Sequence, residues 1–240
     1  MRAVRFLLLL AVVLALPVTA WMMHSGLLQV PARWNPWAAL DIAERPGMFT
    51  RMKLDRLASG PPAACYAWLD AAGVRHTPIA DRFETESCGW QGATRLSAFG
   101  GVRLSSAVSL SCPVAAALAL WERHALQPAA IVQFGSPVSR VDHLGSYACR
   151  NIYGGSYDRR SEHARANALD IASFRMGDGR VVSVLKGWRK ADAVPTPEGA
   201  FLREASKGAC PYFSAVLGPE YNSAHFDHLH LDLGRYRVCR

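Results

Sequence analysis

Residues 224–232 form the sequence Ala-His-Phe-Asp-His-Leu-His-Leu-Asp, which holds three of the chain's eight histidines, His225, His228 and His230. Apolar and polar residues alternate over residues 226–233, and this period of two predicts a β-strand. Because successive side chains of a strand point to opposite faces, His228 and His230 would lie on the same side. Neutral imidazole is the commonest protein ligand of zinc, so this strand can present one ligand and a second residue beside the metal.

A second cluster of polar residues lies well upstream, at Ser161-Glu162-His163 and at Asp170. Neither segment alone supplies enough ligands for a zinc ion. Together they can close a site of three protein ligands with one open coordination position. That arrangement is typical of catalytic zinc, whereas structural zinc usually has four protein ligands.

The composition predicts a basic, globular protein. Half of the 240 residues are apolar, which allows a sizeable core and excludes global disorder. The net charge is +8 and comes almost entirely from arginine. A basic surface suits polyanionic partners such as a membrane or a cell-wall polymer. The sequence has no block of lysine and arginine with interleaved aromatic residues, so we expect no nucleic acid partner.

Residues 1–23 carry the features of an export signal. Arg2 and Arg5 form a short positive region, an uncharged apolar run follows, and Val18-Thr19-Ala20 resembles the small-residue motif of a cleavage site. The run is also close to the minimum length for spanning a bilayer, so a signal peptide and an uncleaved anchor both remain open. The bulky Trp21 after the motif favours the anchor. Both readings export the rest of the chain to the periplasm, and the second holds it at the inner membrane.

The cysteines agree with export. Their even number predicts three disulfides in an oxidising compartment, and the lack of a Cys-x-x-Cys pair disfavours a cysteine zinc site or a redox motif. Six cysteines allow 15 connectivities, among which the most local pair, Cys65–Cys88, is preferred. The cysteines are Cys65, Cys88, Cys112, Cys149, Cys210 and Cys239.

The remaining patterns predict an α+β fold. The clearest helix covers residues 113–133, with Ser111 as its N-cap, Pro113 in its first turn and Trp121 in the core. Gly177-Asp178-Gly179 predicts the turn of a hairpin. Further helices are expected at residues 52–57, 63–72 and 199–207, hairpins within 73–107, strands at 138–147, 168–174 and 181–185, and a loop at 153–160.

This organisation divides the chain into four parts. Residues 1–23 are the signal peptide or anchor, and residues 24–50 form an extended linker that contains prolines and tryptophans. Residues 51–104 form an N-terminal elaboration stapled by a disulfide. Residues 105–240 form the domain that contains both clusters of histidine and acid, so the predicted site belongs wholly to this last part.

The two clusters resemble motifs of known zinc peptidases. Ser161-Glu162-His163 with Asp170 resembles the S-x-H-x6-D pattern of D-Ala-D-Ala metallopeptidases. His228-Leu229-His230 resembles the H-x-H of the broader lysostaphin, D-Ala-D-Ala metallopeptidase and hedgehog group. Ala166 departs from the pattern, because those peptidases often carry glycine there. Longer stretches of residues 104–240 look like the bacterial extensin-like C-terminal family.

The resemblance implies a fold and a set of site residues. The fold would be a small antiparallel sheet with flanking helices, of the hedgehog or D-Ala-D-Ala-peptidase type. His163, Asp170 and His230 would be the ligands of Zn²⁺, and Arg150 and Ser161 would bind substrate. The guanidinium of Arg150 could receive a peptide carboxylate or stabilise an oxyanion.

Two residues are candidates for proton transfer. Asp227 lies three residues before His230, like the acid in the E-x-x-H or D-x-x-H of related peptidases. His228 corresponds to the first histidine of H-x-H, which assists catalysis without binding the metal. An ideal strand turns Asp227 away from His230, which favours His228, but both remain open. We expect His225 to be peripheral and Asp232 either to hold the second nitrogen of a ligand histidine or to face solvent.

The resemblance therefore implies an exported zinc metallopeptidase that acts on peptidoglycan stem peptides, as a D,D-carboxypeptidase or as a cross-link endopeptidase. The basic surface and the N-terminal segment agree with a cell-wall partner near the membrane. The alternative is a non-catalytic, zinc-containing module that binds or regulates the cell wall, because folds of this group need not catalyse. The presence of Asp227 and His228 beside a complete ligand set favours the enzyme.

Overall fold

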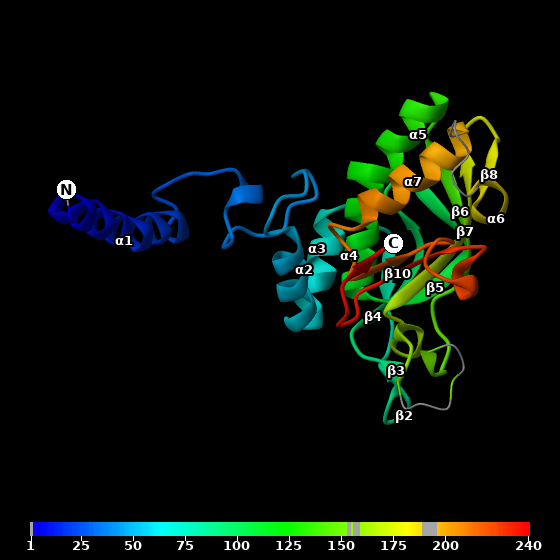
Figure 1. The fold of residues 1–240 in the computed structure, drawn as a ribbon. Helices are drawn as coiled ribbons and strands as arrows, with labels where there is room; N and C mark the ends of the chain where they lie inside the picture. Colours follow the sequence, from blue (N-terminus) through cyan, green and yellow to red (C-terminus); the bar gives the residue numbers. More distant parts are fainter. Residues whose placement is uncertain (1, 153–154, 156–158, 189–195) are drawn as a thin grey trace.

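A computed structural model describes residues 2–152, 155, 159–188 and 196–240 of the chain. It has the predicted α+β class, with helices packed on a nine-stranded sheet within these residues (Figure 1). In spatial order the strands are β1 (His76–Pro78), β4 (Ala93–Phe99), β5 (Val102–Ser111), β6 (Val138–Gly145), β7 (Ala168–Met176), β10 (Leu229–Asp232), β9 (Ala215–Leu217) and β11 (Val238–Cys239), with β8 (Val181–Ser183) also paired to β7.

The sheet is mixed, so the predicted antiparallel sheet is wrong in this respect. Most neighbouring strands are antiparallel, but β5 pairs with β6 in parallel and β11 pairs with β9 in parallel. The first parallel pair arises because a long helical crossover connects β5 to β6, and such a connection can return the chain to the same end of the sheet. Strands β2 (Arg82–Thr85) and β3 (Cys88–Trp90) form a separate hairpin.

The predicted helix over residues 113–133 is present but is not regular throughout. It consists of α4 (Cys112–Trp121), the π-helical turn η2 (Glu122–Leu126) and α5 (Gln127–Phe134). Pro128 has no N–H to donate into the α-helical ladder, and the N–H of Gln127 donates to the carbonyl of Glu122, five residues back. The backbone hydrogen bonds therefore change from the i→i−4 pattern of an α-helix to the i→i−5 pattern of a π-helix directly before the proline.

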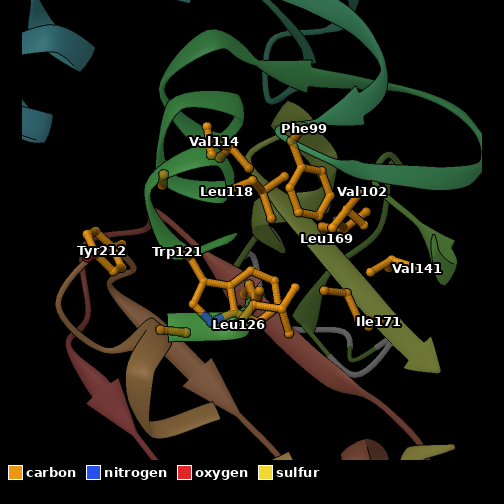
Figure 2. Packing of buried hydrophobic residues seen from close by; sticks show 14 of the residues in the cluster. Phe99, Val102, Val114, Leu118, Trp121, Leu126, Val141, Leu169, Ile171 and Tyr212 are labelled. Carbon is orange, nitrogen blue, oxygen red and sulfur yellow. The ribbon is translucent and has the colours of Figure 1, made fainter. Parts of the chain in front are cut away.

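Trp121 lies at the centre of the core, as predicted. Its ring is fully buried and packs against Phe99 (Figure 2). It also packs against Phe174, and its indole N–H donates a hydrogen bond of 2.8 Å to the carbonyl of Ala205. The carbonyl belongs to α7 (Pro197–Ala209), which packs on α5 and β9. Trp121 thus joins two helices to the sheet, and the bond to Ala205 satisfies its only polar group.

The N-terminal half contributes to the same sheet and core. The helices predicted there are α2 (Thr50–Ser59) and α3 (Pro62–Ala71), and both pack on α4. Strands β1, β4 and β5 continue the sheet beyond β6, and the predicted boundary at residue 104 lies inside β5. Residues 51–104 are therefore packed against the part of the chain that carries the histidine clusters.

The segment before α2 divides into an exposed helix and a stretch that rests on the body. Helix α1 (Arg2–His24) has no buried residue and lies apart from the sheet (Figure 1). Beyond it, the carbonyls of Ala32 and Leu40 accept hydrogen bonds from the side chains of Lys53 and Trp68. The predicted linker is thus held against α2 at Ala32 and against α3 at Leu40.

All six cysteines form disulfides: Cys65–Cys112, Cys88–Cys149 and Cys210–Cys239. The number of bridges is as predicted, but the preferred pair Cys65–Cys88 is wrong. Cys65 lies on α3, which packs against the start of α4, where Cys112 is located. Cys88 lies on the separate hairpin, beside the loop that follows β6. Tertiary packing, which sequence distance does not show, decides the pairing.

Three predicted strands are shorter than expected, and the one at 138–147 ends at Gly145. The strand at 181–185 ends at Ser183, where the short helix α6 (Val184–Gly187) begins. The strand at 226–233 is limited to β10, because the 3-10 turn η5 (Ser223–His225) precedes it and is capped by the Asn222 side chain. Most of the predicted loop at 153–160 lies outside the described residues.

Candidate metal centre

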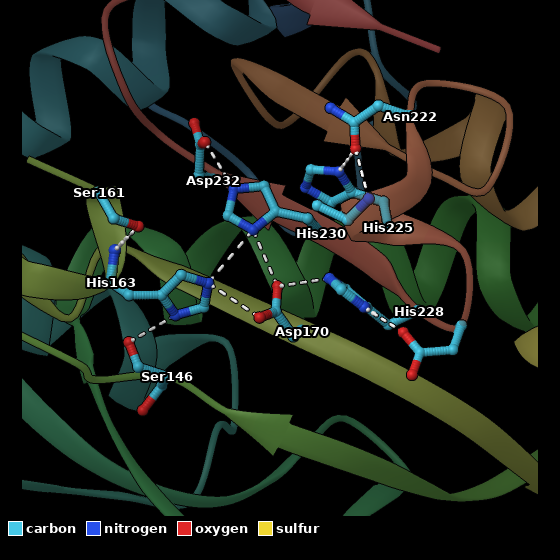
Figure 3. A network of polar contacts seen from close by, with 11 residues as sticks. Ser146, Ser161, His163, Asp170, Asn222, His225, His228, His230 and Asp232 are labelled. Carbon is cyan, nitrogen blue, oxygen red and sulfur yellow. Dashed lines mark hydrogen bonds and ion pairs between the residues drawn. The ribbon is translucent and has the colours of Figure 1, made fainter. Parts of the chain in front are cut away.

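Two of the predicted ligands come from neighbouring strands. Strands β7 and β10 are antiparallel, and their register places His230 directly opposite Asp170. Directly opposite residues of antiparallel strands have side chains close enough to interact on one face. The Nδ1 atom of His230 lies 2.8 Å from Oδ1 of Asp170 (Figure 3). The pairing of these two strands therefore builds two thirds of the site.

The third residue, His163, lies on the 3-10 turn η4 (Glu162–Arg165), which leads into β7. The side chain of Ser161 caps this turn by accepting a hydrogen bond from the backbone N–H of His163. The turn ends at Ala166, whose φ of 52° is in the left-handed region. Glycine adopts this conformation without strain, whereas most other residues adopt it at a cost. Alanine follows the same backbone path.

His163, Asp170 and His230 converge on one point. One potential ligand atom from each lies within 4.8 Å of the other two, and the two histidines are almost fully buried. The Nε2 atom of His163 is 3.0 Å from Oδ2 of Asp170 and 3.2 Å from Nδ1 of His230 (Figure 3). Two imidazole nitrogens and a carboxylate form a donor set that can hold a divalent metal ion.

Outer hydrogen bonds fix which nitrogen of each histidine faces the centre. The Nδ1 atom of His163 lies 3.3 Å from the carbonyl oxygen of Ser146, and a carbonyl can only accept, so a neutral His163 ring carries its proton on Nδ1 and offers the lone pair of Nε2 to a metal. On His230, the Nε2 atom is 2.8 Å from Oδ2 of Asp232, which leaves Nδ1 toward the centre. A carboxylate or carbonyl on the second nitrogen is the usual support of a metal-binding histidine.

The same contacts shift the pKa values of the central pair. Burial by itself raises the pKa of Asp170, but hydrogen bonds from His163 and His230 outweigh it and hold that pKa well below its usual range. Burial by itself lowers the pKa of His230, but its bonds to Asp170 and Asp232 raise the pKa to about 9. Without a metal, the centre therefore favours an ionised Asp170 and a protonated His230.

The two candidates for proton transfer contact each other. The Nδ1 atom of His228 is 2.8 Å from Oδ1 of Asp227, and its Nε2 atom is 3.6 Å from Oδ1 of Asp170. His228 precedes β10, so the alternation expected for an ideal strand does not apply to Asp227. The carboxylate of Asp227 accepts the Nδ1–H of His228 and directs Nε2 of that ring toward the centre.

His225, which we expected to be peripheral, lies at the centre. It is buried, and its ring centroid is 5.2 Å from that of His228 and 5.7 Å from that of His230. Asn222 Oδ1 accepts from its Nδ1–H at 2.8 Å. Burial and then the neighbouring charges of His230 and His228 lower the pKa of His225 to about 4. Its spacing of three residues from His228 fits a turn, and the strand interpretation concealed this signal.

The group opens into a cleft with a volume of about 870 Å³. Arg150 and Ser161 both line it, although the hydroxyl of Ser161 is already engaged with the backbone of His163. The cleft also exposes the aromatic rings of Tyr221 and Tyr236. Every residue predicted for metal or substrate binding thus borders one accessible space.

Comparison with known proteins gives one match. A family model described as "Extensin-like protein C-terminus" matches residues 63–240, a range that includes the entire histidine and acid group. No curated protein and no solved structure matches the chain. A relation to the D-Ala-D-Ala metallopeptidases stays a prediction from the motifs.

Proposed function

The chain belongs to the extensin-like protein C-terminus family, and we propose that it is an exported, zinc-dependent peptidase of peptidoglycan. It would hydrolyse an amide bond in stem peptides or in their cross-links. The observation that carries this proposal is the buried His163–Asp170–His230 group at the base of an open cleft. A structural metal site would be closed, whereas this one faces a space large enough for a peptide.

Export is supported by two independent features. Helix α1 is long and apolar enough to cross a membrane and contains no buried residue. The three disulfides indicate an oxidising compartment. We place the folded part in the periplasm and take α1 as an uncleaved anchor in the inner membrane.

Zinc fits the residues that are present. His163 Nε2, His230 Nδ1 and the Asp170 carboxylate would hold it, and Ser146 and Asp232 would keep the two rings oriented. When bound, zinc supplies Lewis-acid activation of water and of the scissile carbonyl.

Asp227 and His228 act together in this proposal. Asp227 holds the proton on Nδ1 of His228, so that Nε2 can accept a proton and later donate it to the leaving amine. This is the logic by which a carboxylate orients a catalytic histidine. Arg150 would bind a substrate carboxylate from the wall of the cleft. Ser161 would contribute mainly by positioning His163.

The proposal can be tested on purified muropeptides. The full-length chain in detergent, loaded with zinc, is incubated with monomeric and cross-linked muropeptides, and the products are separated by chromatography. Loss of a terminal D-alanine identifies a carboxypeptidase, and conversion of dimers to monomers identifies an endopeptidase. A chelator should abolish either product and added zinc should restore it.

His163→Ala should remove the activity, while His76→Ala, which lies outside the cleft, should retain it. If the wild type binds sacculi but gives the same empty chromatogram as His163→Ala, the enzymatic proposal is wrong. That result would instead favour a non-catalytic wall-binding module.

A further inference from the structure

The cleft carries an excess of positive charge. Five arginines line it, against three carboxylates. The arginines are Arg150, Arg159, Arg160, Arg165 and Arg235.

All three carboxylates already have partners. Asp170 contacts His163 and His230. Asp232 contacts His230 through one oxygen and accepts the backbone N–H of Gly234 through the other. Glu162 accepts a hydrogen bond of 2.8 Å from the side chain of Asn167. None of the arginines in the cleft is paired with these acids within the described residues.

The arginines fall into two groups. Arg160 is held by Ser87 and Asn151, at 2.7 and 2.9 Å, and Arg159 stacks on the ring of Tyr236. The other three, Arg150, Arg165 and Arg235, are exposed and have no acidic partner in the part of the chain that the structure describes. Their guanidinium groups are available to a ligand.

Arg165 and Arg235 come from two segments that touch. Gly234 lies against Glu162, so closely that a Cβ atom at this position would approach Oε1 of Glu162 to 2.8 Å. The backbone N–H of Leu233 also donates to the carbonyl of Asn167. Arg150 lies on another segment, and its backbone carbonyl accepts a hydrogen bond from the backbone N–H of Ser161. The cleft therefore presents cations from separate segments around the metal centre.

We propose that Arg165 and Arg235 form a second anion subsite, which binds an internal carboxylate of an acidic peptide while Arg150 binds the C-terminal carboxylate. This inference rests on the proposed function and specifies its substrate as a stem peptide with free, rather than amidated, internal carboxylates. Guanidinium groups bind carboxylates through paired, charge-assisted hydrogen bonds. An amide removes the charge and replaces one acceptor oxygen with a donor, so it cannot match two arginines.

The test compares two peptides on the full-length, zinc-loaded protein. One is L-Ala-γ-D-Glu-meso-diaminopimelate-D-Ala-D-Ala with both internal carboxylates free. The other carries the same carboxylates as primary amides, and both keep the C-terminal carboxylate. The dissociation constant is measured by calorimetry on the His228→Ala variant, and hydrolysis is measured on the wild type. We expect amidation to raise the dissociation constant and KM about tenfold.

The double variant Arg165→Gln/Arg235→Gln should bind both peptides equally, within about twofold. The matched control, Arg103→Gln/Arg123→Gln, removes the same charge at exposed positions outside the cleft and should keep the tenfold preference. Equal binding of both peptides by the wild type, binding of neither, or loss of the preference in the control would overturn the subsite. Preferential binding of the free-carboxylate peptide without hydrolysis would support the subsite and contradict the peptidase activity. Hydrolysis of both peptides without any preference would support the peptidase activity and contradict the subsite.

Discussion

Asp170 is the residue on which the centre depends most directly. Both of its oxygens are used: Oδ1 faces His230 and His228, and Oδ2 faces His163. A carboxylate in this position brings three imidazoles together without a metal. The same arrangement offers a divalent ion a ready donor set, because only the central protons have to leave.

Asp232 supports His230 from outside, and its removal should weaken metal binding. In Asp232→Asn, the neutral amide can no longer hold the charge and orientation of His230. We expect the affinity for zinc to fall roughly 10- to 100-fold while the fold is retained. Competition with a chromogenic chelator measures this change. Asp178→Asn, at the exposed turn after β7, is the control and should bind zinc like the wild type.

The metal-free protein should lose stability at alkaline pH. The pKa of His230 is raised from 6.5 to about 9, so its contribution is complete below pH 6.5 and is lost as the pH rises through 9. The pKa of Asp170 is lowered from 3.8, so its contribution is present above that value and is lost at more acidic pH. The melting temperature of the chelated protein should therefore be highest between these limits.

Zinc should reverse the alkaline loss, because the ion takes the place of the proton on His230. The affinity of the protein for zinc should therefore rise with pH up to about 9, where His230 has lost its extra proton. The alkaline loss should persist in His76→Gln and disappear in His230→Gln. A loss of equal size in both variants would assign it to other groups.

At the scale of the elements, the turn η4 and the strand pair β7–β10 determine the geometry of the site. Ala166 allows the chain to turn from His163 into β7 by adopting a left-handed conformation, and its side chain is fully buried. A substitution that changes the backbone at Ala166 should therefore displace His163 and alter the metal centre.

Ala166→Val should lower the free energy of unfolding by about 2 kcal/mol or more, because a β-branched residue is strained at this φ and the core there is closed. The displaced η4 should also reduce zinc binding. Ala166→Gly should keep both properties close to those of the wild type. Urea unfolding and zinc titration of the two variants measure these effects, and an unchanged valine variant would contradict the role given to this turn.

Many of the helices, strands and turns could be predicted from the sequence. The helix over 113–133, strand β7 and the hairpin turn after it follow from local periodicity and turn residues. The shortening of β10 did not, because it depends on a side-chain cap from Asn222. The position of His225 was missed for the same reason. His163, Asp170 and His230 were grouped by motif, but their supports, such as the carbonyl of Ser146, come from a distant loop and leave no pattern in the sequence.

At the scale of the whole molecule, disulfides connect parts that the sequence separates. Cys65–Cys112 joins α3 to α4 across 47 residues, and Cys88–Cys149 joins the β2–β3 hairpin to the loop of Arg150. The pairing could not be predicted, because it follows from which helix packs on which.

Removal of the first bridge should destabilise the entire body. Cys65→Ser/Cys112→Ser should lower the free energy of unfolding by about 2–4 kcal/mol, since the unfolded chain regains the freedom of a long loop. Zinc binding at saturation should be unaffected, because neither cysteine lies at the metal centre. Chemical denaturation of the zinc-loaded protein gives the first quantity, and metal content gives the second. A variant that is as stable as the wild type would show that the bridge adds nothing to the core.

The register of His230 opposite Asp170 has a consequence for how the sheet opens. Within the described strands, β9, β10 and β11 join the rest of the sheet only through the ladder between β10 and β7. A metal ion bound by both Asp170 and His230 would cross-link β7 and β10 in addition to their backbone hydrogen bonds. The two strands could then separate only after the ion had been released. Amide hydrogen exchange along β9 and β11 should then slow as zinc concentration rises. The occupancy of the centre would thus be recorded by backbone protons of β11, which pairs with β9 and not with either strand that carries a ligand.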